Sequence, residues 1–259
     1  MRLQVVLMAV LVGGGVRASG GEPTHTAAAG GKTQEGTVDP RADAALRRMS
    51  DYVGSLQSFR VDTNTVDDKV ATDGQKIEEV QPSKVTVKRP GELRVERVSP
   101  AGRAIFIDNG KQFSLYNKDK NVFATHAAPA TLDEALEMAR TRLHIDAPAG
   151  DLILPDSYST LIDGTVTGRY IGLEPIEGVM AHHLAFTKKN TDWQIWIKDG
   201  PEAVPLRFVI TSKDMPGQPK FTAELRRWQA NVPVAANEFA FTPPPGAQRV
   251  DLTRRQAQR

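Results

Sequence analysis

The residues that could do chemistry are few and scattered. His182 and His183 are neighbours in the sequence, and adjacent residues of a strand point to opposite faces, so the two cannot ligate one metal ion together. The acidic pairs Asp67–Asp68 and Glu78–Glu79 are typical of solvated strand ends or turns. The sequence contains no zinc-protease, nucleophile-elbow or Walker motif. We therefore expect no catalytic residue, no metal and no cofactor. An enzyme whose site is assembled from distant residues stays open as a third hypothesis.

Composition excludes several further classes. The chain of 259 residues has 33 Lys+Arg and 31 Asp+Glu, a net charge of +2, which argues against a nucleic-acid binder because such proteins need a basic face. It contains 0 cysteines, which excludes disulfides, thiolate metal sites and lipid attachment through an N-terminal cysteine. Hydrophobic residues make up 40%, enough for a globular core.

The N-terminal segment predicts export. Residues 1–18 combine Arg2, an apolar run and small residues that end at Ala18, as a secretory signal peptide does. The apolar run is too short for a membrane-spanning helix, which needs about 20 residues. Residues 19–38 are rich in Gly, Ala, Thr and Ser and predict a flexible leader. We expect a periplasmic protein that does not span the membrane.

Two helical regions and two runs of strands must position whatever site exists. Asp39-Pro40 can cap a helix whose apolar residues recur at spacings of three and four from Ala45 to Leu56. Thr131 to Glu134 forms a capping box before a second helical stretch, and a shorter helical stretch is expected over residues 152–161, interrupted near Pro155.

Five or six strands are expected between the helices and about five after them. Asn109-Gly110 is a strong hairpin signal, and short turns between consecutive strands favour antiparallel pairing. The fold class is therefore α+β, with one large antiparallel sheet and helices against one face. We expect one domain over residues 39–250, followed by a polar, basic tail at 251–259.

Part of this pattern resembles a known group of envelope proteins. A helix that leads into Ser58-Phe59, the strand that ends in Lys88-Arg89-Pro90, and the hairpin Asp108 to Lys111 before Leu115-Tyr116 resemble the LolA/LolB-like superfamily, whose members carry outer-membrane lipoproteins. The segments 181–186, 192–197 and 239–247 resemble an uncharacterised family of predicted periplasmic proteins, a domain of unknown function that is expected to share the LolA-like fold.

The resemblance implies a strongly curved, unclosed half-barrel with helices on its concave face and an apolar cavity. In the carriers an arginine of the Lys-Arg-Pro motif helps to hold a helical lid, which implies that role for Arg89; a solvated charge at a strand end is the alternative. The expected cavity residues are apolar side chains of the strands: Phe106, Phe113, Leu115, Leu184, Trp193 and Ile195. Alternation leaves open which face is concave, so Ile105 could replace Phe106.

Three further side chains have two interpretations each. An inward-facing His182 is more often a hydrogen-bonded core residue than a metal ligand. Trp196, and Trp228 on the face of Glu224 and Arg226, could mark a partner or lipid interface, or could be covered by neighbouring aliphatic stems.

Three functions are compatible with these observations. The first is a periplasmic binding module that holds an apolar or lipidated ligand in the half-barrel cavity. The second is a cell-envelope protein-interaction or sensor module whose cavity is filled by its own side chains. An enzyme is the third. We expect a monomer whose partners are an apolar or lipidated ligand and an envelope protein, with no nucleic acid.

Overall fold

The computed structural model describes residues 37–142 and 147–251. The predicted signal peptide, the leader up to residue 36 and the tail from residue 252 lie outside the described residues. The helices are α1 (Pro40–Ser55), α2 (Leu132–Arg142), α3 (Ser157–Ile162) and the short 3₁₀ helices η1 (Gly150–Ile153) and η2 (Ala236–Phe239). The strands are β1 (Ser58–Val70), β2 (Lys76–Lys88), β3 (Glu92–Ser99), β4 (Gly102–Asn109), β5 (Gln112–Asn117), β6 (Val122–Ala127), β7 (Thr165–Ile176), β8 (Val179–Lys188), β9 (Thr191–Lys198), β10 (Pro205–Ser212), β11 (Lys220–Ala230) and β12 (Gln248–Arg249).

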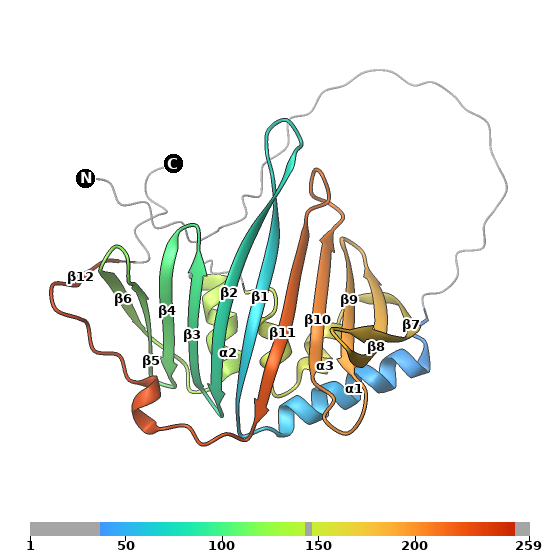
Figure 1. Ribbon diagram of the computed structural model, residues 1–259, viewed down its shortest axis with the longest axis horizontal. Helices are drawn as coiled ribbons and strands as arrows, with labels where there is room; N and C mark the ends of the chain where they lie inside the picture. Colours follow the sequence, from blue (N-terminus) through green and yellow to red (C-terminus); the bar gives the residue numbers. More distant parts are fainter. Residues whose placement is uncertain (1–36, 143–146, 252–259) are drawn as a thin grey trace.

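The strands of the described part form a single sheet with the order β12-β6-β5-β4-β3-β2-β1-β11-β10-β9-β8-β7. Neighbours are antiparallel except for the short pair β12 and β6, which is parallel. The sheet curves around α1, α2 and α3, which all lie on one side of it, and its ends do not meet (Figure 1). The predicted α+β class and the curved, unclosed antiparallel sheet with helices on its concave face are therefore confirmed.

Helix α1 begins and lies where the sequence pattern predicts. The Asp39 side chain accepts a hydrogen bond from the Arg41 N–H, and Pro40 occupies the first turn, which is favourable because its missing N–H would have no partner there. Leu46, Met49 and Val53 form the stripe that is fully buried against the sheet. Burial of this stripe is what holds a single amphipathic helix in place.

The predicted turns are also present. Asn109 ends β4, and its side chain accepts from the N–H groups of Lys111 and Gln112, while Gly110 takes a φ of 76°. That positive φ explains the glycine, since residues with a Cβ rarely adopt it. The helical stretch predicted over 152–161 is divided into η1 and α3, with Pro155 between them.

The chain that follows β11 covers part of the convex face. Phe239 of η2 is 1% exposed, and Arg94 of β3 donates to the carbonyl of Glu238. Phe241 packs on the rings of Tyr116 and Phe123. In Figure 1 this segment passes along the lower end of the sheet toward β12. The C-terminal segment therefore covers part of the convex surface of β3 to β6, and the helices cover part of the opposite face.

Candidate functional site

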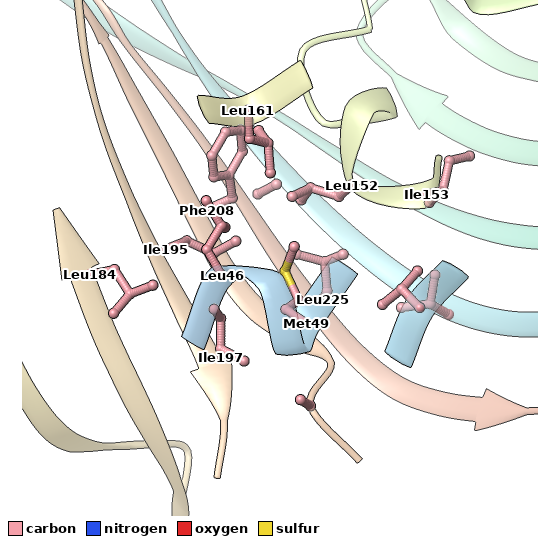
Figure 2. Close-up of a cluster of buried hydrophobic side chains, with 14 of the residues drawn as sticks. Leu46, Met49, Leu152, Ile153, Leu161, Leu184, Ile195, Ile197, Phe208 and Leu225 are labelled. Atoms are coloured by element: carbon pink, nitrogen blue, oxygen red, sulfur yellow. The ribbon is translucent and has the colours of Figure 1, made fainter. Parts of the chain in front are cut away.

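The half of the hollow that lies under α1 is filled by side chains. Leu184 and Ile195 are 0% exposed and Trp193 is 3% exposed. They belong to one core cluster with Leu46 and Met49 of α1, and Figure 2 shows the side chains of α1, η1 and α3 meeting those of β8 to β11. Three of the six predicted cavity residues therefore form a packed core, in which Trp193 also stacks on Phe186 with ring centroids 4.1 Å apart.

The other three predicted cavity residues lie on β4 and β5. Phe106 pairs directly with Leu115, and Phe113 stacks on Phe106 with centroids 5.6 Å apart, so all three side chains share the concave face. Ile105, one residue away, lies on the convex face. Phe113 is 2% exposed, but Phe106 and Leu115 are half-buried.

These two residues continue an apolar row that crosses four strands. Val85 pairs with Val95, and Val95 pairs with Phe106, so Val85, Val95, Phe106 and Leu115 are neighbours on the concave face. All four are half-buried, whereas Val87 and Leu93, two residues along β2 and β3, are buried. The helices thus seal one end of the concave face and leave this apolar row partly uncovered.

Arg89 joins the sheet to the helices. Its Nε donates to the carbonyl of Leu56 at 3.0 Å, and its Nη2 donates to the carbonyls of Val53 at 3.1 Å and Ile153 at 3.0 Å. It therefore contacts the C-terminal end of α1 and the end of η1 together. Burial lowers the pKa of Arg89, and the nearby carboxylate of Asp133 opposes that shift. The geometry suits an anchor of the helical layer; the lid role stays a prediction.

The two histidines point to opposite faces, as predicted. On the concave side, His182 Nδ1 lies 2.8 Å from the Tyr170 hydroxyl and Nε2 lies 3.0 Å from Asp199. On the convex side, His183 Nδ1 lies 3.0 Å from Glu174 and Nε2 lies 2.9 Å from Gln194. Each ring therefore has two protein partners, which is the pattern of a structural histidine.

One of the three tryptophans, Trp228, lies on a different face from the sequence expectation. Trp196 is 8% exposed and is covered by the His183 ring at 4.0 Å, so it is not an exposed interface residue. The expectation that Trp228 shares a face with Glu224 and Arg226 is wrong: its ring packs on Phe59 at 5.3 Å, on the concave side. The physical reason is a β-bulge, where Arg227 has a φ of 53° and the register with β1 shifts.

A pocket of about 580 Å³ lies at the rim of the sheet and was not predicted. The turn between β7 and β8, the loop between β9 and β10, the end of β11 and Tyr52 of α1 enclose it. Several of its charged residues are paired, such as Lys198, which lies 2.7 Å from Glu202. A second pocket, of about 450 Å³, is lined mostly by charged residues that include Lys84, Glu96 and Arg103. None of the six predicted cavity residues lines either one. The alternation of apolar and polar residues could not predict these pockets, because it does not show which loops lie close together in the fold.

The described residues hold no group of three or more His, Cys, Asp or Glu that could bind a metal ion. None of the helices in the described part is long and apolar enough to cross a membrane.

Comparison with known proteins places the sequence in a family and shows structures of similar fold. Residues 42–253 match the family described as "Predicted periplasmic protein (DUF2092)". No curated protein matches the sequence.

Solved structures similar to the chain come from several bacteria. The lipoprotein LppX of Mycobacterium tuberculosis is 17% identical, with a TM-score of 0.49, over 76% of this chain and 99% of LppX. LprF of Mycobacterium bovis is 18% identical, with a TM-score of 0.49, over 81% of this chain and 98% of LprF. A LolA superfamily protein of Nitrosomonas europaea is 11% identical, with a TM-score of 0.41, over 77% of this chain and 97% of that protein.

Proposed function

Because the chain belongs to the DUF2092 family of predicted periplasmic proteins, we propose that it acts in the periplasm as a binding protein for an apolar or lipidated ligand, held on the concave face of its sheet. The periplasmic location expected from the N-terminal segment is confirmed by the family; the signal peptide itself stays a prediction. The binding role goes beyond the periplasmic location, and the geometry of the concave face supports it.

The observation that carries the proposal is the half-buried apolar row of Val85, Val95, Phe106 and Leu115. A monomer gains stability by covering such side chains, and here the helices cover the neighbouring residues and leave these four accessible. Each methylene buried against them contributes about 0.8 kcal/mol, so one acyl chain can supply micromolar affinity after ordering costs. Of the predicted cavity residues, Phe106 and Leu115 would contact that chain, and the buried Phe113 would support the Phe106 ring.

Native mass spectrometry of protein purified from a periplasm tests the proposal directly. We expect a co-purified lipid that leaves on mild activation. In a second assay, the neutral fluorescent probe N-phenyl-1-naphthylamine should bind the delipidated protein and be displaced by decanoate.

A matched pair of variants localises the binding. Leu115 and Ile105 are both half-buried and lie on adjacent strands but on opposite faces. Leu115→Gln should weaken probe binding about tenfold, the loss of about 1.4 kcal/mol of apolar contact, while Ile105→Gln should leave it within about twofold. Equal affinities in the two variants would place the ligand elsewhere.

The filled half of the hollow supports a second candidate. Leu184, Ile195 and Ile197 have no exposed surface, as expected for a half-barrel that packs on its own helices and serves as a protein-interaction or sensor module. Absence of both co-purified lipid and probe binding would favour this candidate over the first.

A further inference from the structure

The concave face changes from apolar to polar along the strands, in the direction away from the helices. On β3 the concave residues are Leu93, which is buried, then Val95, which is half-buried, then Arg97. On β2 the next concave residue after Val85 is Ser83, and on β1 the next after Val61 is Thr63. A polar row therefore lies directly beside the half-buried apolar row.

The three polar side chains are neighbours by register. Thr63 pairs with Ser83, and Ser83 pairs with Arg97. Directly paired residues of antiparallel strands have Cβ atoms about 4.5–5.5 Å apart, so the three side chains leave the sheet next to one another. Each of the three residues is half-buried, and all three contribute to the lining of the pocket of about 450 Å³.

These donors have no partners of their own. Among the residues that the structure describes, none makes a hydrogen bond or ion pair with the Thr63 hydroxyl, the Ser83 hydroxyl or the Arg97 guanidinium. Of the neighbouring carboxylates, Asp67 forms an ion pair with Lys69. Glu79 accepts only from the neutral Gln81 amide, at 3.4 Å, and keeps its charge. Burial lowers the pKa of Arg97, and the more distant Glu79 opposes that shift.

We infer that this row, Thr63, Ser83 and Arg97, binds the oxyanion headgroup of an amphiphilic ligand whose acyl chain lies on the adjacent apolar row. A guanidinium with two hydroxyl donors is the donor set that recognises phosphate or carboxylate oxygens. The inference rests on the proposed function and adds to it the chemical class of the ligand. The anion would give Arg97 a close ion pair in addition to its longer-range attraction to Glu79, and the two hydroxyls would fix its position.

The test compares two ligands with the same chain. Decyl phosphate and 1-decanol differ in charge at the headgroup, so each is titrated against the delipidated protein by displacement of N-phenyl-1-naphthylamine. Decyl phosphate should bind at least about tenfold more tightly than 1-decanol, since a charge-assisted interaction has about this strength. The preference should fall as salt concentration rises.

Variants assign that preference to the polar row. Arg97→Gln should remove the preference while leaving 1-decanol binding within about twofold, and the double variant Thr63→Val, Ser83→Val should reduce it severalfold. Arg60→Gln is the matched control, because Arg60 lies on β1 like Thr63, points to the convex face, pairs with Glu238 and does not line this pocket; it should keep the preference.

The outcomes separate the inference from the function. Equal affinity for decyl phosphate and 1-decanol in the unmodified protein overturns the headgroup site and leaves apolar binding intact; this measurement needs no variant to fold. Inorganic phosphate that binds as tightly as decyl phosphate overturns the assignment to an amphiphile. If neither decyl phosphate nor 1-decanol binds, the proposed function is refuted as well.

Discussion

Replacing Arg89 by leucine removes the only side chain seen in the described structure to bond α1, η1 and the sheet at once. Three hydrogen bonds, to the carbonyls of Val53, Leu56 and Ile153, are lost. Hydrogen bonds from a charged group contribute about 1.5–3 kcal/mol each when counted singly. The leucine also removes the cost of burying a guanidinium whose Nη1 has no partner among the described residues. We therefore expect a net loss of about 2–4 kcal/mol in the free energy of unfolding.

Urea unfolding measures the global loss, and hydrogen exchange locates it. The amides at the C-terminal end of α1 and in η1 should exchange faster in Arg89→Leu, while those of β8 to β10 should change less. Ligand release should accelerate in the same variant if the helical layer acts as a lid.

Arg103→Leu provides the control, since Arg103 is exposed and bonded only to Asp119; it should change stability by less than about 1 kcal/mol. Equal losses in the two variants, or unchanged exchange in both α1 and η1, would refute the anchoring role of Arg89.

Two other expected outcomes concern stability. Asp108 is 1% exposed, and burial raises its pKa to about 6. Because this pKa lies above that of an unfolded aspartate, its stabilising contribution is full below about pH 4 and is lost as the pH rises through about 6. Between pH 4 and pH 7, the free energy of unfolding measured in urea should therefore fall by about 2–3 kcal/mol less in Asp108→Asn than in the unmodified protein. Identical pH profiles of the two proteins would contradict this. Phe239→Ala should cost about 3–5 kcal/mol, with Val98→Ala, at an exposed position, as the comparison; a loss under about 1 kcal/mol would show that the C-terminal segment is not part of the fold.

The elements of this fold could be predicted because their signals are local. The cap at Asp39, the stripe from Leu46 to Val53 and the hairpin at Asn109 each depend on residues a few positions apart. The pairing of β1 with β11 could not be predicted, because those strands are separated by most of the chain and no local pattern encodes their register.

The same limit applies to the candidate site. Alternation indicates that Ser83 and Arg97 each point to the face of their neighbouring valines, but only the register shows that they pair. For Trp228, the alternation pattern itself gave a wrong prediction. Strict alternation assigned it to the wrong face, because a single residue with positive φ, Arg227, reverses the alternation beyond it.

The central position of β1 and β11 has a consequence for how the chain acquires its structure. Strands β1 to β6 and β7 to β11 each pair with sequence neighbours, and in the described sheet the two meanders join through β1 and β11, the first and the last long strand. Such a contact has a very large sequence separation, and loops of that size close slowly. We expect β1 and β11 to pair only after the chain has been synthesised through residue 230, where β11 ends. A chain of this topology stays incomplete during synthesis, which suits a polypeptide that crosses a membrane before it folds.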